Sequence, residues 1–358
     1  MESWPASALV ALAGGIGGII LGLAARLARF CTLAAIEDAM FSSDLRRLRM
    51  WALALAIAIT SVSILSELGL VDFSKTLYHQ LNLNPVAWIL GGLMFGVGMA
   101  FCGTCGYGTL ARVGGGDLRA LFGFLVLGVS AYMAIAGPTA LLRIYFLAPL
   151  AIGGSDAPRT FSDLLGPSAV PGIVLPFAIA LVLALWSVGS AQFRKSGIHV
   201  FWGAMVGLAI ASGWVATGWL IVDPFEPQPL ASHTFSAPLG QTLIYFMTMS
   251  SATLSFGIGG TLGVIFGAFV GALVKKEFRW EGADDAREMR RHLVGAFLMG
   301  TGGVYAGGCT IGQGLSAASV LAISAPVVMI SIWCGVWLGL NYLMDGSVLG
   351  GLRALLKR

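Results

Sequence analysis

Cysteine is the residue type in this sequence best suited to chemistry, and two of the cysteines form a close pair. Cys102 and Cys105 make a Cys-Gly-Thr-Cys motif, a pattern typical of redox pairs and of half a zinc site. All four histidines lie outside this motif and no second cysteine pair follows it, which argues against zinc. A redox pair stays open as one interpretation.

An internal repeat singles out one member of this pair. An offset of 204 residues (309 minus 105) aligns two glycine-rich segments, 96–108 and 300–312. The matched pairs are Gly96 with Gly300, Gly98 with Gly302, Gly103 with Gly307, Cys105 with Cys309, and Gly108 with Gly312. Cys102 aligns with Ala306, which indicates that Cys102 serves packing. Two glycine-packed helices with incidental cysteines are the alternative interpretation.

The elements that must position these residues are membrane helices. Hydrophobic residues make up 57% of the 358 residues and charged residues 11%, which leaves too little polar material to cover a soluble core. Apolar runs such as 51–65, 171–186 and 327–343 approach the length that spans a bilayer as a helix. The alternation of a barrel strand is absent from the sequence. The sequence therefore predicts an all-α integral membrane protein.

Basic residues predict the orientation of these helices. They gather near 46–49, 194–195, 275–291 and 353–358, and the positive-inside rule places such segments in the cytoplasm. The rule yields about nine crossings, with a periplasmic N-terminus and a cytoplasmic C-terminus. The expected crossings are 8–30, 51–70, 86–111, 119–136, 171–190, 199–222, 241–275, 293–323 and 326–344. The stretch 138–151 is too short to span and predicts a re-entrant or interfacial turn.

In this topology the two repeat segments run in opposite directions. That arrangement is an inverted repeat, with a first half of residues 1–192 and a second half of residues 193–358, and such proteins bind substrate where paired broken helices meet. The glycines around each repeated cysteine weaken the helix there, and the amides exposed at such breaks suit an anion. The span 241–275 is too long for one straight helix, so a break is expected near Gly257, Gly259 and Gly260.

A third cysteine ends the first span. Cys31 follows Arg26 and Arg29 near the predicted cytoplasmic end, and these arginines either supply positive potential for an anion or extend to the interface. A weaker match has an offset of 185 residues (203 minus 18) and puts Cys31 on Ala216. Its matched pairs are Gly18 with Gly203 and Gly22 with Gly207. Cys334 lies in the last apolar run and is expected to be a small core residue.

These motifs resemble those of the YeeE/YedE-type sulfur-transport family, membrane proteins that take up thiosulfate. The resemblance rests on three sequences, Arg29-Phe-Cys31, Gly98-Met-Ala-Phe-Cys102-Gly-Thr-Cys105 and Gly307-Gly-Cys309-Thr310-Ile-Gly312-Gln313-Gly314. It implies an hourglass-shaped protein in which three cysteines line a narrow path. Carried over to this chain, they are Cys31, Cys105 and Cys309, which would pass thiosulfate along by thiol hydrogen bonds without forming disulfides.

The predicted substrate-binding residues are these cysteines and the glycine-rich breaks around them. They are Cys31, Cys105, Cys309, Gly103, Gly106, Gly108, Gly307, Gly308, Thr310, Gly312 and Gln313. The chain departs from the family at Gln313, where histidine is frequent, and at Cys102, which is extra. The first departure bears on the identity of the substrate. The resemblance also implies a cytoplasmic sulfur-carrier partner of the TusA type.

Thiol chemistry supports the same interpretation without the resemblance. A thiol is a weak donor and a soft, polarizable acceptor, and conduction needs sites weak enough to release the ion. We therefore expect a thiosulfate or related sulfur-anion transporter or channel in a bacterial inner membrane, with no enzyme activity, cofactor, metal or nucleic-acid partner. The alternatives are a selenium compound or another sulfur species as cargo, a purely structural membrane subunit, and a membrane thiol oxidoreductase that uses Cys102 and Cys105.

Overall fold

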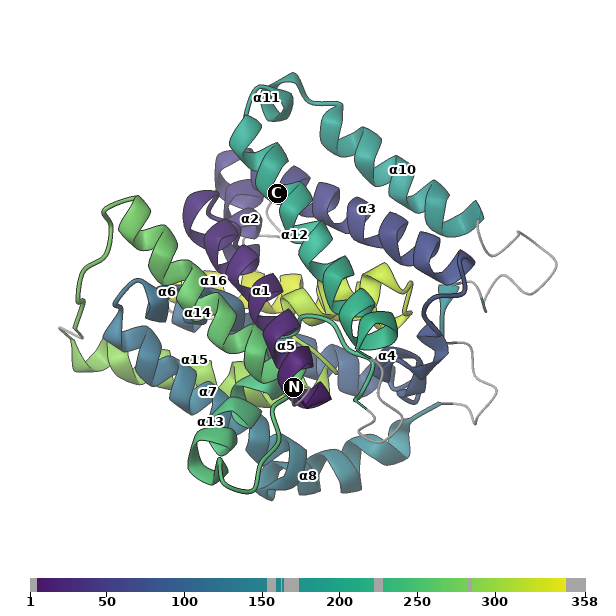
Figure 1. Ribbon diagram of the computed structural model, residues 1–358. Helices are drawn as coiled ribbons and strands as arrows, with labels where there is room; N and C mark the ends of the chain where they lie inside the picture. Colours follow the sequence, from purple (N-terminus) through teal and green to yellow (C-terminus); the bar gives the residue numbers. More distant parts are fainter. Residues whose placement is uncertain are drawn as a thin grey trace.

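A computed structural model describes residues 5–152, 159–161, 163, 174–221, 228–282 and 285–345. Over these residues long helices cross one another in a bundle, with short helical pieces between them (Figure 1). The long helices are α1 (Ala6–Leu27), α3 (Arg46–Glu67), α5 (Pro85–Cys102), α7 (Leu118–Ala136), α10 (Val174–Val188), α12 (Gly197–Val215), α14 (Phe256–Val274), α15 (Ala286–Tyr305) and α16 (Ser324–Asp345). The short α-helices are α2 (Thr32–Glu37), α4 (Leu77–Gln80), α6 (Gly106–Gly114), α8 (Pro138–Leu142), α11 (Ala191–Arg194) and α13 (Ala237–Thr248). Single turns of π or 3₁₀ helix are η1 (Asp38–Ser42), η2 (Phe73–Lys75), η3 (Arg143–Leu147), η4 (Ala148–Leu150), η5 (Ala216–Leu220) and η6 (Gly312–Ala317).

Within the described ranges, seven helices are long and apolar enough to cross a membrane. They are Ala6–Leu27, Arg46–Glu67, Pro85–Gly114, Leu118–Ala136, Gly197–Leu220, Phe256–Val274 and Ser324–Met344. This confirms the predicted class, an all-α integral membrane protein. Two other helices coincide with the remaining predicted crossings: α10, of 15 residues, and α15, whose first turns carry several charges. The count of nine crossings therefore stays a prediction, and the apolar helix Pro138–Leu150 is short, as expected.

Glycines let the long helices approach each other at backbone distance. A Cβ added to Gly18 of α1 would lie 2.4 Å from the carbonyl oxygen of Gly260 in α14, and one on Gly22 would lie 2.3 Å from that of Val264. A Cβ on Gly96 of α5 would lie 2.2 Å from the Ile332 carbonyl of α16. Small residues at such contacts are the usual means of packing helices in lipid, where burial of apolar surface against water does not drive association.

The long helices pair in a pattern that repeats along the chain. α1 packs along α14, and α12 packs along α3; α5 packs on α16, and α15 packs on α7. α5 and α15 also pack on each other, as do α1 and α12. Exchanging α1 with α12, α3 with α14, α5 with α15 and α7 with α16 maps the first four of these pairs onto one another and each of the last two onto itself. Two related halves would produce this pattern; the boundary between residues 192 and 193 stays a prediction.

The expected break in the span 241–275 is present, but its glycines have another role. α13 ends at Thr248 and α14 begins at Phe256, so the interruption precedes Gly257, Gly259 and Gly260. These glycines lie inside α14, and a Cβ on Gly259 would come within 1.8 Å of the Ala11 carbonyl oxygen of α1. The break thus lies near these glycines, as predicted, but the glycines do not form it. At Gly259 the missing side chain instead gives α1 room to approach.

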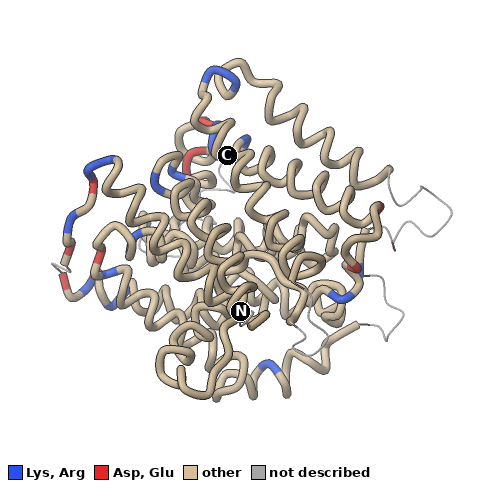
Figure 2. Tube along the Cα trace, in the orientation of Figure 1, with Lys and Arg blue, Asp and Glu red and all other residues tan. Residues whose placement is uncertain are grey.

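Charged side chains gather at the ends of the helices. Figure 2 shows the basic residues of the α2–α3, α11 and α14–α15 regions along the upper and left edges of the view. Arg46, Arg47, His199 and Lys275 line one shared cavity, so these separate segments meet on one face. This agrees with the prediction that they share a side of the membrane. The basic segment 353–358 lies outside the described residues, as do most residues of the predicted periplasmic segment 153–167.

Candidate functional site

The first repeat segment is a broken helix with Cys105 at the break. α5 ends at Cys102, and Gly103 follows in the left-handed region with φ of 63°, a conformation that favours glycine. Cys105 is then the N-cap residue of α6, and its sulfur accepts a hydrogen bond from the Gly108 N–H at 3.4 Å. The Cys105 side chain is fully buried. The glycines on both sides of the thiol therefore produce the break that the sequence predicts.

The second repeat segment has the same geometry. α15 ends at Tyr305, Gly307 adopts φ of 72°, and helical structure resumes directly after Cys309. The buried Cys309 sulfur accepts from the Gly312 N–H at 3.4 Å, the counterpart of the contact between Gly108 and Cys105. Each thiol thus lies at the start of a helix, where free N–H groups and the helix dipole favour an electron-rich atom.

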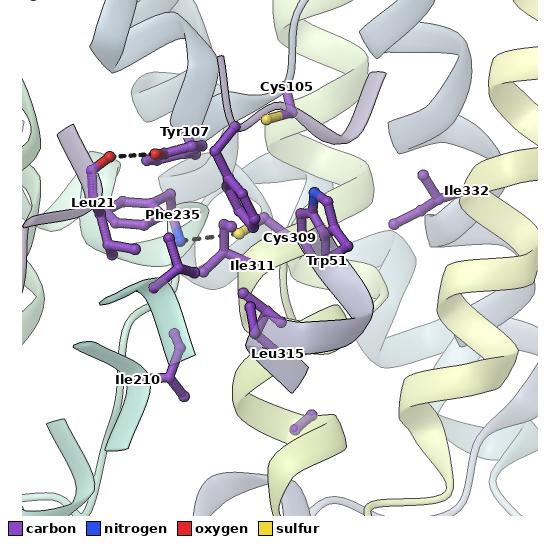
Figure 3. Packing of buried hydrophobic residues seen from close by; sticks show 14 of the residues in the cluster. Leu21, Trp51, Cys105, Tyr107, Ile210, Phe235, Cys309, Ile311, Leu315 and Ile332 are labelled. Carbon is purple, nitrogen blue, oxygen red and sulfur yellow. Dashed lines mark hydrogen bonds between the residues drawn. The ribbon is translucent and has the colours of Figure 1, made fainter. Parts of the chain in front are cut away.

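Cys309 has two further hydrogen-bonding partners that come from another part of the chain. The Phe235 N–H donates to its sulfur at 3.1 Å (Figure 3), and Thr234 Oγ1 lies 3.8 Å from the same atom. Both residues precede α13. A Cβ on Gly106 would come within 2.7 Å of the Phe235 carbonyl oxygen, so this glycine gives the segment room beside the first break as well.

Cys31 is the N-cap residue of α2 and is half-buried. Its side chain lies next to that of Cys105, so the structure brings these two predicted residues together. The weak sequence match had aligned Cys31 with Ala216, which lies in η5 at the end of α12. In the structure, Thr234–Phe235 lies beside Cys309 in the way that Cys31 lies beside Cys105. This segment comes later in the chain than Ala216, because the second half has a longer connection before α13.

A cavity of about 350 Å³ opens beside Cys31 and the first break. Its lining includes Cys31, Gly103, Thr104 and Gly108, together with the charged residues Arg26, Arg29, Glu37, Arg47 and Arg112. Arg112 Nη2 also donates to the Gly103 carbonyl at 2.8 Å and so holds the turn before Cys105. Four arginines against one glutamate give the cavity a positive potential. Arg26 and Arg29 thus lie where they can attract an anion, one of the two roles that the sequence left open.

Burial and its neighbour Asp38 change the acidity of Glu37. Both raise the pKa of the Glu37 carboxyl, which lies in the connection between α1 and α3 and outside the long helices. A raised carboxyl pKa reduces the negative charge next to the arginines as pH falls toward the acid range. The positive potential of the cavity therefore strengthens at lower pH.

Aromatic rings surround the region between the two buried thiols. Phe30 stacks on Trp51 with ring centroids 4.8 Å apart, and Tyr107 contacts Phe30 at 6.4 Å and Phe235 at 5.5 Å. The Tyr107 hydroxyl donates to the Leu21 carbonyl of α1. Figure 3 shows Trp51, Tyr107 and Phe235 beside the space between Cys105 and Cys309. These rings make the surroundings of the two buried thiols largely apolar.

Three other buried polar groups lie near the cysteines. Thr32 Oγ1, Trp51 Nε1 and Thr310 Oγ1 are buried and have no hydrogen-bond partner among the described residues. Buried polar atoms usually have one, so these three groups have hydrogen-bonding capacity that no described residue uses. Thr310 was predicted as a substrate-binding residue from its place in the motif. Trp51 stands at the start of an apolar run, and nothing in the sequence marked it as a site residue.

Gln313 and Gly308 pack against each other at the second break and support its turn. The Gln313 amide nitrogen donates to the Ala306 carbonyl at 2.9 Å, and its oxygen accepts from Ser324 Oγ at 3.0 Å. A Cβ on Gly308 would lie 3.2 Å from the Gln313 side chain. The amide thus links the end of α15 to the start of α16 and holds the turn that carries Cys309.

Cys102 and Cys334 do not join the three thiols. All five cysteines are free. The buried Cys102 thiol donates to the His292 carbonyl at 3.1 Å, which agrees with the packing role predicted for Cys102 and leaves it unpaired with Cys105. Cys334 is exposed on α16, so the expectation of a core position was wrong: this side of the last helix faces outward and not into the bundle.

The fold and the site define a class of protein, a multi-pass helical membrane protein with cysteines at two glycine-rich helix breaks. The chain belongs to the sulphur transport family, whose model matches residues 27–338. It is 27% identical over 335 residues to a thiosulfate transporter TsuA from Spirochaeta thermophila, which covers 90% of this chain and 96% of the relative. It is also 27% identical over 352 residues to a thiosulfate transporter TsuA from Escherichia coli K12, at 91% and 92% coverage. The resemblance seen in the sequence motifs is thereby confirmed.

Proposed function

We propose that this protein conducts thiosulfate, or a closely related sulfur-containing anion, across a bacterial inner membrane. The observation that carries the proposal is the matching position of Cys105 and Cys309. Each thiol begins a helix at a glycine break and accepts one N–H at 3.4 Å, and Cys31 adjoins Cys105. The names of the two relatives support thiosulfate as the cargo.

The proposed mechanism is a relay of weak contacts. Thiosulfate passes Cys309, then Cys105 and then Cys31, and each thiol hydrogen-bonds to the anion without a covalent bond. A soft sulfur atom binds a sulfur anion weakly enough to release it, and several weak sites in sequence replace the lost hydration. The protein changes no bond of its cargo, so the proposal assigns transport and no enzymatic step.

In the proposed topology residues 1–192 and 193–358 form inverted halves, with the N-terminus periplasmic and the C-terminus cytoplasmic. The arginine-lined cavity at Cys31 then opens toward the cytoplasm, in agreement with the positive-inside rule. There the positive potential of the cavity attracts the anion as it leaves the path toward the cytoplasm. A cytoplasmic sulfur-carrier protein of the TusA type would receive thiosulfate at this exit.

Uptake of radiolabelled thiosulfate by cells that express single variants tests the relay. Cys31→Ser, Cys105→Ser and Cys309→Ser should each remove most uptake at matched membrane levels, because an oxygen atom keeps the donor but loses the soft sulfur. Cys334→Ser is the matched control, since Cys334 lies outside the path, and it should keep wild-type uptake. Wild-type uptake by all three path variants would refute the relay.

A further inference from the structure

Two hydroxyl side chains lie next to Cys309 and belong to neither cysteine motif. Thr234 Oγ1 is 3.8 Å from Cys309 Sγ, and the Tyr78 hydroxyl lies next to the Thr234 side chain. A Cβ placed on Gly312 would lie 2.3 Å from Thr234 Oγ1 and 3.3 Å from the Tyr78 hydroxyl oxygen. Both hydroxyls therefore face the start of the helix that Cys309 begins.

The short helix α4, which carries Tyr78, is held against the helix break at Cys309 by hydrogen bonds and side-chain contacts. His79 Nε2 donates to the Val320 carbonyl at 3.0 Å, and Arg159 Nη1 donates to the His79 carbonyl at 2.7 Å. A Cβ on Gly307 would lie 3.0 Å from the Leu81 side chain. Tyr78 itself is only 9% exposed, so its hydroxyl is held in place and a ligand meets it without first ordering a loop.

The neighbours of the two buried thiols differ in chemistry. The Cys105 thiol has the Cys31 thiol beside it, whereas the Cys309 thiol has the Thr234 hydroxyl and the Phe235 N–H. Hydroxyl and amide groups are the stronger hydrogen-bond donors, and a thiol is a weak one. The Cys309 site thus suits the oxygen atoms of an anion, and the site of Cys105 and Cys31 suits its sulfur.

We infer that Tyr78 and Thr234 recognise the oxygen atoms of the transported anion at Cys309 and so select sulfur anions that carry oxygen. This inference rests on the proposed function and deepens it. At 3.8 Å the contact between Thr234 and Cys309 is weak, so the hydroxyl loses little when it turns toward an oxyanion. A hydrogen bond to a charged oxygen is stronger than the neutral contact that it replaces.

The test compares two substitutions of similar size at one position. Thr234→Val keeps the shape but removes the hydroxyl, and Thr234→Ser keeps the hydroxyl. Thr234→Val should raise the KM for radiolabelled thiosulfate uptake about tenfold, equivalent to about 1.4 kcal/mol, with less than a twofold change in maximal rate. Thr234→Ser should stay within about twofold of wild type on the same scale. Tyr78→Phe should raise the KM in the same direction as Thr234→Val.

Tyr305→Phe is the matched control for the tyrosine. The Tyr305 hydroxyl donates to the Thr139 carbonyl at 2.7 Å, at the contact of α15 with α8, so its loss should leave the KM unchanged. A KM for Thr234→Val equal to that of Thr234→Ser would overturn the inference, whether or not Tyr78→Phe reaches the membrane. Cys309→Ala separates the two proposals. Full uptake by Cys309→Ala would refute the relay. If Cys309→Ala is inactive but Thr234→Val and Tyr78→Phe keep the wild-type KM, only the selection of oxygen is refuted.

Discussion

At the scale of single residues, repetition made the site predictable. Cys105 and Cys309 stand in matching glycine spacings, and that spacing predicted both their equivalence and the helix breaks. Tyr78, Thr234 and Trp51 carried no such signal. Thr234 comes from the connection before α13, and Tyr78 from a four-residue helix, so their contacts with the site depend on tertiary packing that a local pattern does not encode.

Cys102 provides a test at this scale. Its thiol donates to the His292 carbonyl where α5 packs on α15, away from the relay. We expect Cys102→Ala to keep most thiosulfate uptake and to lower the free energy of unfolding by about 1 kcal/mol, the usual contribution of one hydrogen bond. The measurements are uptake by cells and thermal unfolding of the purified protein.

Loss of uptake in Cys102→Ala as complete as in Cys105→Ala would contradict this expectation. A disulfide between Cys102 and Cys105, found by mass spectrometry of the protein from membranes, would then favour the oxidoreductase interpretation. Cys334→Ala serves as the control for removing a cysteine from a helix, because Cys334 is exposed on α16.

At the scale of elements, the helix breaks depend on residues that tolerate a left-handed backbone. Gly103 and Gly307 both adopt it, with φ of 63° and 72°, and each turn places a cysteine at the start of the next helix. The sequence predicted these breaks because glycine and cysteine recur together. It predicted a break near Gly257, Gly259 and Gly260, and the break lies directly before them. These glycines are nevertheless inside α14, because a glycine that admits a neighbouring helix, as Gly259 does, looks the same in sequence as a glycine that turns the chain.

Gly307→Ala should strain the turn before Cys309 and lower uptake. A left-handed conformation costs a residue with a side chain about 1–2 kcal/mol, and the backbone can relieve that strain by moving Cys309. Gly69→Ala is the matched control: Gly69 has φ of 64° in a loop, with no neighbour within 4 Å of an added Cβ. Both variants should lower the melting temperature by a similar amount.

The two variants should differ in thiosulfate uptake, measured at matched membrane levels. We expect Gly307→Ala to lose most of it and Gly69→Ala to keep it. Equal uptake by the two variants would mean that the turn at Gly307 can relax without moving the thiol, and that its geometry is not needed for transport.

At the scale of the whole molecule, charge and hydropathy predicted the membrane class but not the pairing of helices. Within the described residues, seven helices are long and apolar enough to cross a membrane. The contacts of α1 with α14 join residues such as Gly18 and Gly260, and those of α3 with α12 join residues such as Met50 and Gly203, which are far apart in the chain. Similar small-residue faces on several helices leave many pairings open to a sequence argument. The same ambiguity explains why Cys334 was assigned to the core.

The orientation can be measured with single cysteines that react with a membrane-impermeant maleimide. Ser74→Cys in η2 and Gly282→Cys after α14 both replace exposed residues. The proposed topology places the first in the periplasm and the second in the cytoplasm. Intact cells should therefore label Ser74→Cys alone, and opened cells should label both. Labelling of both variants in intact cells would rule out this topology, and the unsubstituted protein measures reaction at the native cysteines.

The glycine contacts between α1 and α14 and between α5 and α16 also bear on the energetics of turnover. Helices that touch backbone to backbone cannot slide or rock without first separating, and close-packed interiors yield in discrete steps and not by gradual deformation. In the proposed relay, we therefore expect passage past Cys309, Cys105 and Cys31 to depend on rotations of side chains such as Phe30 and not on movements of whole helices. A conduit of this kind has a small activation enthalpy, so its flux should rise gently with temperature, and the membrane gradient and the removal of thiosulfate inside the cell should decide the direction of flow.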